Sequence, residues 1–131
     1  MKLEFKNHQL KIISEFLYAL KLTGRTSRAR QKLNKKVSDK LIEFSNDMAE
    51  LEHEYSDEKE LMNAKVELAK ETAIIDVSEY KGLMKNLYNG LLDYAYELEG
   101  QNSVSHDLVL DELEKYIEDD SEENTNLVEV E

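Results

Sequence analysis

The sequence predicts a mainly α-helical protein, a helical bundle of about five helices around one long helix, with a minor two-stranded β ribbon added. Proline is absent and only four of the 131 residues are glycine, so few residues interrupt helices. Apolar residues recur at spacings of three and four over most of the chain, which is typical of amphipathic helices. Two short segments, residues 2–6 and 72–77, instead have patterns typical of strands.

The N-terminal segment predicts a strand followed by a helix. Apolar and charged residues alternate in Lys2–Lys6, as in a half-buried strand. Asn7 offers a side-chain oxygen as the N-cap of a helix that we expect from about His8 to Leu22. Gly24 then suits the left-handed residue that ends such a helix.

The next segment predicts the long helix of the fold. Thr26 or Ser27 is the candidate cap, and the helix should extend from about Ser27 to Tyr55. From Val37 onward, apolar residues alternate between spacings of four and three, which is typical of a coiled-coil seam. The seam consists of Val37, Leu41, Phe44, Met48, Leu51 and Tyr55.

The middle of the chain predicts a third helix and a second strand. Ser56 and Asp57 are candidate caps of a shorter helix, and the acidic residues that follow favour a helix N-terminus. Thr72–Val77 is apolar and rich in β-branched residues, so we expect a strand that pairs with Leu3–Phe5. The alternative is that the third helix continues through Thr72–Val77.

The C-terminal part predicts two more helices and a tail. Ser78 is the expected cap of a helix over residues 79–99, and residues 100–106 are expected to form a loop. Ser105 or Asp107 should cap the last helix. Seven acids and no base follow from Glu118 to the C-terminus. We therefore expect one helical domain over residues 1–118 and an acidic flexible tail over residues 119–131.

Charge is distributed unevenly along the chain. The formal net charge is -12, yet residues 1–40 carry eleven Lys or Arg and three acids, and residues 41–131 carry six Lys and twenty-six acids. A basic block opens the long helix, where cations oppose the helix dipole and repel one another. Local stability therefore does not explain the block, and we predict that it binds a partner. The block consists of Arg25, Arg28, Arg30, Lys32, Lys35 and Lys36.

Three anionic groups are candidates for neutralising the basic block. The first is the acidic half of the same chain. The second is an acidic surface of another protein or of a second copy, for which the planar guanidinium of Arg is well suited. The third is nucleic acid, which the strongly acidic remainder of the chain would repel.

Acidic residues form two dense clusters. Each cluster predicts either a solvated surface or a helical face that imitates a nucleic-acid backbone in the basic groove of a partner. The first consists of Glu50, Glu52, Glu54, Asp57, Glu58 and Glu60, and the second of Asp111, Glu112, Glu114, Glu118, Asp119 and Asp120.

Motifs for catalysis or cofactor binding are not found in the sequence. It contains no cysteine, no P-loop pattern and no glycine-rich dinucleotide turn. Glu50, His53 and Asp57 share one helical side as a possible metal site, but the abundance of acids favours a solvated face. We therefore expect no catalytic residue, cofactor, metal or small-molecule substrate. No stretch is apolar enough to span a bilayer, so we expect no membrane contact. The absence of cysteine makes a reducing cytoplasm the expected compartment.

Three stretches carry a resemblance to a known family. They are "LKIISEFLYALKLTG" (Leu10–Gly24), "SRARQKL" (Ser27–Leu33) and "ELEHEYSDEKE" (Glu50–Glu60), which lie within about the first sixty residues. In these stretches the chain resembles a family of small phage and prophage proteins of unknown function from low-GC Gram-positive bacteria. The resemblance implies an accessory or virion and tail-assembly protein in the host bacterial cytoplasm or the virion, and it brings no catalytic residues.

The expected function is therefore contact with another macromolecule. The partner is expected to be a phage or host protein, or a second copy in a homo-oligomer. One alternative is an acidic inhibitor that mimics nucleic acid and blocks a host nuclease or an anti-phage effector such as a CRISPR enzyme. A further alternative is a nucleic-acid-binding module that uses the basic block.

Overall fold

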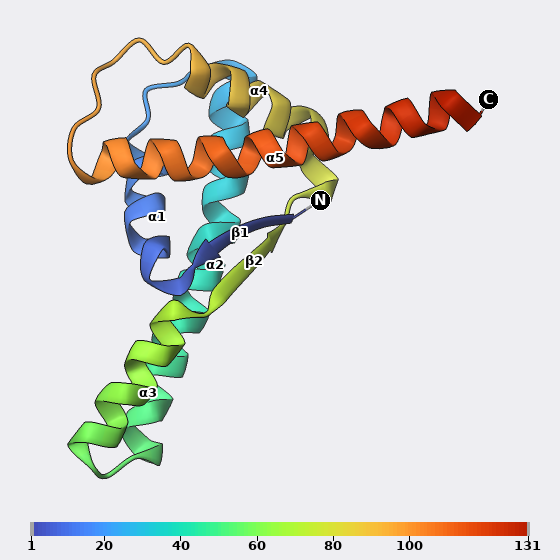
Figure 1. The fold of residues 1–131 in the computed structure, drawn as a ribbon. Coiled ribbons are helices and arrows are strands. Elements are labelled where there is room, and N and C mark those ends of the chain that lie inside the picture. Colours follow the sequence, from blue (N-terminus) through green and yellow to red (C-terminus); the bar gives the residue numbers. More distant parts are fainter. Residues whose placement is uncertain (1, 131) are drawn as a thin grey trace.

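The computed structural model describes the backbone of residues 2–130 and the side chains of residues 2–118. Its elements in chain order are β1 (Lys2–Lys6), a 3-10 turn (Asn7–Gln9), α1 (Leu10–Ala19), α2 (Gly24–Glu54), α3 (Glu58–Lys70), β2 (Thr72–Asp76), a second 3-10 turn (Ser78–Tyr80), α4 (Lys81–Leu92) and α5 (Gln101–Val130) (Figure 1). The predicted mainly helical fold with a small β ribbon is confirmed.

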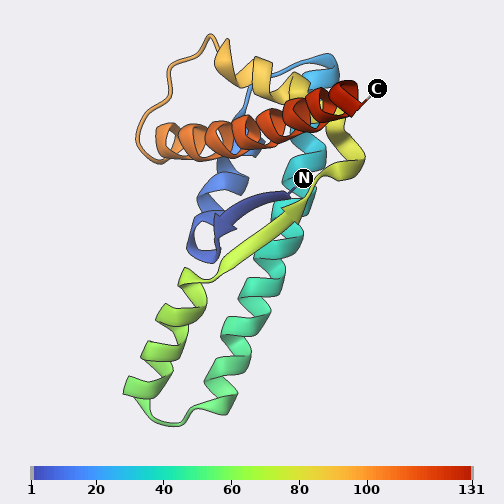
Figure 2. The same cartoon turned by 45° about the vertical axis from the view of Figure 1, so that its right-hand side comes forward.

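The molecule has a compact head and a projecting arm (Figures 1 and 2). The head contains the ribbon, α1, the N-terminal half of α2, α4 and the N-terminal part of α5. The arm, residues 41–71, is the hairpin of the C-terminal half of α2 with α3, and it extends away from the head. Every fully buried residue of α2 lies before the arm, and α3 has none. The hydrophobic core therefore lies in the head alone.

The β ribbon covers one side of this core. β1 and β2 pair antiparallel, with Leu3 opposite Ile75 and Phe5 opposite Ala73. These four side chains are buried, whereas their neighbours along each strand are exposed. The prediction that residues 72–77 begin a strand paired with the N-terminus is confirmed, and the alternative of a continuous helix is wrong.

The helices of the head supply the rest of the core. Their buried residues recur at spacings of three and four, so each helix turns one apolar face inward. The buried apolar residues are Leu10, Ile13, Phe16 and Leu17 of α1, Ala29, Leu33 and Val37 of α2, Met84, Leu87 and Leu91 of α4, and Val109, Leu113 and Tyr116 of α5.

The first helix is shorter than predicted. It runs from Leu10 to Ala19, and Asn7 does not cap it, because the Asn7 side-chain amide donates to the carbonyl oxygen of Leu68 at 2.9 Å. Helix α1 ends because Leu20 is extended and buries its side chain in the core. Asn7 thus joins the ribbon to the end of α3, a contact that local sequence does not reveal.

The long helix begins earlier than predicted. Its N-cap position is Thr23, and neither Thr26 nor Ser27 caps it. Gly24 has a φ of 60°, the left-handed region expected for it, but it opens α2 instead of closing α1. The predicted extent from about Ser27 to Tyr55 is otherwise close to the observed helix. Asp57 caps α3 as predicted, because its carboxylate accepts the Glu60 N–H at 3.0 Å.

The predicted helix over residues 79–99 is wrong beyond Leu92, where α4 ends. Tyr94 lies in the following loop, and the main-chain N–H of Lys21 donates to its hydroxyl at 3.0 Å. Ser78 does not cap α4, since both its N–H and its hydroxyl donate to the Asp76 carboxylate. The apolar spacing of the sequence continues past Leu92, but the chain leaves the helix there and Tyr94 contacts the α1–α2 connection.

The predicted loop over residues 100–106 is also wrong, because α5 begins at Gln101. Gly100 has a φ of 58° and supplies the turn before the helix. Ser105 is buried inside α5 and Asp107 lies on it, so neither is a cap. The predicted flexible tail over residues 119–131 lies outside the residues whose side chains are described, and it stays a prediction. No helix of the described chain is both long and apolar enough to cross a membrane.

Candidate functional site

All six residues of the predicted basic block lie in the first half of α2, but one of them has a structural role. The Arg30 guanidinium donates to the carbonyl oxygens of Leu17 at 3.2 Å and Tyr18 at 3.1 Å, and to the hydroxyl of Ser27 at 2.9 Å. These carbonyls belong to the last turn of α1, which leaves its final acceptors without helical partners. Arg30 therefore closes the end of α1 and is not available to a partner.

Two other cations of the block pair with acids of the same chain. Lys36 forms an ion pair with Glu79 and lies 5.5 Å from the centre of the Tyr80 ring. The hydrogen bond to Glu79 raises the pKa of Lys36. Lys35 pairs with Asp39 at 3.7 Å, one turn along α2, and this pair is largely exposed. The chain's own acids thus neutralise part of the block.

The remaining cations form what we call the basic edge, Arg25, Arg28 and Lys32. All three are exposed, and their spacings of three and four place them on one side of α2. Lys32 lies 5.8 Å from the centre of the Tyr80 ring. Within residues 2–118, no carboxylate forms an ion pair with any of them. The predicted partner-binding role of the block stays a prediction, and the basic edge is the part free to perform it.

The trio considered as a metal site does not assemble. Helix α2 ends at Glu54, so Asp57 leaves the helical face that Glu50 and His53 share. The Asp57 carboxylate instead caps α3. Among the described side chains, no group of three His, Asp or Glu residues is arranged to hold a metal ion.

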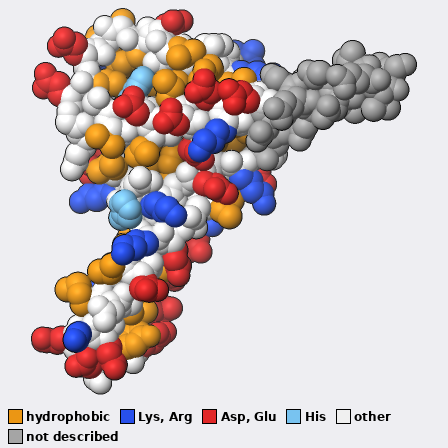
Figure 3. Space-filling view, viewed as in Figure 1, with side chains coloured by type: hydrophobic (Ala, Val, Ile, Leu, Met, Phe, Trp, Pro, Cys, Tyr) orange, Lys and Arg blue, Asp and Glu red, His pale blue; other side chains and the backbone are white. Residues whose placement is uncertain are grey.

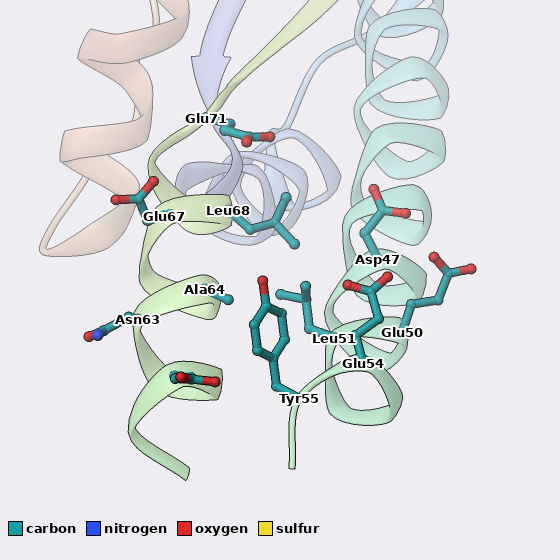
Figure 4. A pocket seen from close by; sticks show the side chains of 11 residues that line it. Asp47, Glu50, Leu51, Glu54, Tyr55, Asn63, Ala64, Glu67, Leu68 and Glu71 are labelled. Atoms are coloured by element: carbon teal, nitrogen blue, oxygen red, sulfur yellow. The ribbon is translucent and has the colours of Figure 1, made fainter. Parts of the chain in front are cut away.

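A groove of about 570 Å³ lies between α2 and α3 in the arm (Figure 4). Its floor is formed by Leu51, Tyr55, Ala64 and Leu68, and the Tyr55 ring stands between the two helices. Carboxylates form both rims: Asp47, Glu50 and Glu54 on the α2 side, and Glu60, Glu67 and Glu71 on the α3 side. Figure 3 shows acidic side chains gathered around hydrophobic ones toward the end of the arm.

The groove exists because only two helices form the arm. Two packed helices cover each other's apolar stripes on one side and leave the other side open. Leu51, Ala64 and Leu68 accordingly remain half-buried. A salt bridge of 2.8 Å between Lys65 and Glu52 joins the helices, and its hydrogen bond lowers the pKa of Glu52. The arm is thus held together by a partial apolar seam and an exposed ion pair.

The sequence indicated the parts of this groove but not their assembly. The coiled-coil seam over Val37–Tyr55 and the acidic cluster over Glu50–Glu60 were both visible. The signal that could have joined them is the Asp57 cap, which begins a second amphipathic helix two residues after the seam ends and so indicates a hairpin.

The second acidic cluster, on α5, is partly structural. The Glu112 carboxylate accepts the main-chain N–H of Glu4 at 2.8 Å and an ammonium proton of Lys115 at 2.9 Å. Glu112 therefore accepts a main-chain N–H on the edge of β1 that does not face β2. The side chains of Asp119 and Asp120 lie outside the described ones.

Two surfaces of opposite charge thus remain as candidates for function, the basic edge on the head and the groove on the arm. The basic edge is formed by exposed side chains of one helix, and the groove by half-buried and exposed side chains of one hairpin. In comparisons with known proteins, no family model, no curated protein and no solved structure matches this chain.

Proposed function

We propose that the chain is a non-enzymatic interaction protein that acts by surface contact, with the basic edge as its contact surface. One observation supports this most strongly: Arg25, Arg28 and Lys32 have no carboxylate partner within residues 2–118, in a chain with 29 acids and 17 Lys or Arg. Arg25 lies in the first turn of α2, where a cation opposes the helix dipole, so the stability of this helix does not explain it. Partner binding gives the three cations a role.

The partner of the basic edge is an acidic surface of another protein or of a second copy. The edge spans the eight residues from Arg25 to Lys32, a length of about 10 Å, which matches a small cluster of carboxylates. Arginine pairs with carboxylates through two parallel hydrogen bonds. The resemblance of the N-terminal half to small phage proteins supports a phage-encoded accessory or virion and tail-assembly component in the host cytoplasm.

Affinity capture from phage-infected or lysogenic bacteria tests this proposal. The wild type is compared with a variant that carries Arg25→Glu, Arg28→Glu and Lys32→Glu. The matched control carries Lys11→Glu, Lys59→Glu and Lys70→Glu, which makes the same charge change at exposed lysines elsewhere. We expect a specific partner, identified by mass spectrometry, to be lost only from the first variant. Equal capture by all three proteins would refute the role of the edge.

A second candidate function, an acidic inhibitor that mimics nucleic acid, is supported by the carboxylates on the rims of the groove. Such binding weakens steeply with salt, whereas apolar assembly does not. The third candidate, nucleic-acid binding by the basic edge, is opposed by the net charge of -12. A gel-shift experiment with nucleic acid at low salt tests this third candidate, and the absence of a shift would refute it.

A further inference from the structure

We propose that the groove of the arm binds a cationic amphipathic helix of a partner protein, which completes a three-helix bundle with α2 and α3. This surface is distinct from the basic edge, and the proposal does not rest on the function assigned to that edge. The groove lies on the arm and the basic edge on the head, so each surface can be altered by substitutions that leave the residues of the other in place.

The floor of the groove determines that the partner has an apolar stripe. Leu51, Ala64 and Leu68 are half-buried, and 37% of the Tyr55 surface is exposed. These side chains belong to two parallel rows that face one another across the hairpin (Figure 4). A third helix that packs along both rows would bury them as residues of a helical bundle are buried.

The length of the groove determines how much helix it can contact. Along α2 it extends from Asp47 to Tyr55, a distance of about 12 Å at the rise of an α-helix. Two to three turns of a partner helix cover this distance, so about three apolar residues at spacings of three and four can reach the floor. An extended peptide would place alternate side chains away from the floor, and it fits the two helical rows less well.

The rims determine the charge of the partner. Carboxylates line both long sides of the groove, so Lys or Arg on both flanks of the apolar stripe would meet opposite charge. Residues 41–71 carry ten acids and three lysines, a net charge of -7. Two arms would therefore repel each other, and nucleic acid would be repelled as well. The basic edge of a second copy fits poorly, because its three exposed residues offer charge without an apolar stripe.

A designed peptide tests the proposal directly. The probe is a roughly 18-residue peptide of Leu and Lys with Leu at helical spacing, and the control is a scrambled peptide of the same composition. Labelled peptides are titrated with the full chain by fluorescence anisotropy, and the contacted residues are mapped by NMR shifts of backbone amides. We expect one helical peptide per chain, shifts around Leu51 and Ala64, and about tenfold weaker binding of the scrambled peptide.

Two variants separate apolar docking from charge attraction. Ala64→Glu adds a carboxylate to the floor, so it increases attraction for cations but opposes apolar contact. We expect it to weaken binding of the helical peptide by about tenfold. The double variant Glu50→Gln with Glu67→Gln keeps the floor and should weaken binding a few-fold, with a difference that shrinks from about 50 to about 300 mM salt. Its matched control, Glu15→Gln with Glu97→Gln, changes exposed acids outside the groove and should bind like the wild type.

The proposal is overturned if both peptides bind equally, if Ala64→Glu binds as tightly as the wild type, or if the NMR shifts lie outside the arm. It is also overturned if the chain self-associates through the groove in sedimentation experiments and Arg25→Glu abolishes that association. As a control, circular dichroism of each variant should give the helical content of the wild type.

Discussion

The Arg30 guanidinium donates a hydrogen bond to the carbonyl oxygen of Tyr18, 3.1 Å away, and so a side chain of α2 closes the end of α1. The same group also reaches Leu17 and Ser27. The connection between these helices is short, and Arg30 joins the last turn of the first helix to the second. Arg30 therefore belongs to the basic block in sequence, but its role is to stabilise the fold.

Replacing Arg30 should therefore destabilise the protein, whereas replacing Arg28 should not. Arg30→Met leaves helix-terminal carbonyls without a donor, and we expect a loss of about 1–3 kcal/mol in the free energy of unfolding. Arg28 is exposed and has no hydrogen bond to another described residue, so Arg28→Met should change this free energy by less than about 0.5 kcal/mol. Urea unfolding followed by circular dichroism measures both, and equal effects would contradict the assignment.

Two glycines of α4 should respond oppositely to alanine. A Cβ at Gly90 would lie 2.6 Å from Cγ2 of Thr26, while the nearest heavy atom to a Cβ at Gly82 is Arg25 Nη2 at 3.9 Å. Gly90→Ala should cost about 1–3 kcal/mol through overpacking between α2 and α4. Gly82→Ala should stabilise the protein by up to about 1 kcal/mol, because alanine favours the helix.

A second substitution tests the cause of the Gly90 effect. Thr26→Ser removes the methyl group that a Cβ at Gly90 would meet, so the double variant should recover most of the stability lost in Gly90→Ala. Thermal unfolding of the two single variants and the double variant completes the cycle. Additive losses would show that the crowding arises elsewhere.

Glu112 should contribute to stability through the edge of β1. Glu112→Ala removes the acceptor of the Glu4 N–H and the partner of Lys115, and we expect a cost of about 0.5–1.5 kcal/mol. Glu112→Gln retains an acceptor oxygen and should cost less. Glu114→Ala, at an exposed position on the same helix, is the control. If chemical denaturation gives the same midpoint for Glu112→Ala and Glu114→Ala, the edge contact is unimportant.

Asp76 should make stability depend on acidic pH. Hydrogen bonds from the hydroxyl and the N–H of Ser78 lower the pKa of Asp76 below its ordinary 3.8. The charged form is thus favoured in the folded state, so its stabilisation is present above that ordinary value and is lost as pH falls through the lower folded pKa. Asp76→Asn should be less stable than the wild type at neutral pH, and the difference should narrow below about pH 4. Unfolding curves across this pH range measure the difference in stability between Asp76→Asn and the wild type, with Asp111→Asn as control. A difference that does not change with pH would contradict this role of Asp76.

Local sequence rules predicted the elements whose signals were local. The β ribbon, the long helix and the Asp57 cap all follow from side-chain pattern and capping chemistry. The end of α4 does not, because Tyr94 and Leu98 continue the helical spacing while they are held by Lys21 and by the core. Such long-range contacts override a periodic pattern, and the pattern itself carries no sign of them.

The charges of the candidate site were visible in the sequence, but their partners were not. Arg30 and Arg28 look alike in the sequence, and only the position of the α1 terminus separates a structural cation from a free one. The groove also required the hairpin, which brings Leu51 and Ala64 to the same surface. Composition therefore indicated that charge is clustered, and the fold determined where each cluster lies.

The absence of fully buried residues on the part of α2 within the arm and on α3 has a dynamic consequence. Amide protons exchange with solvent when a segment opens locally, and segments with few buried contacts open at low free-energy cost. The arm should accordingly exchange its amide protons for deuterium well before α1 or α4, because it unfolds locally while the rest of the molecule remains folded. A partner helix bound in the groove would stabilise the folded arm and slow the exchange of its amide protons. Binding at the groove would therefore make the arm more rigid.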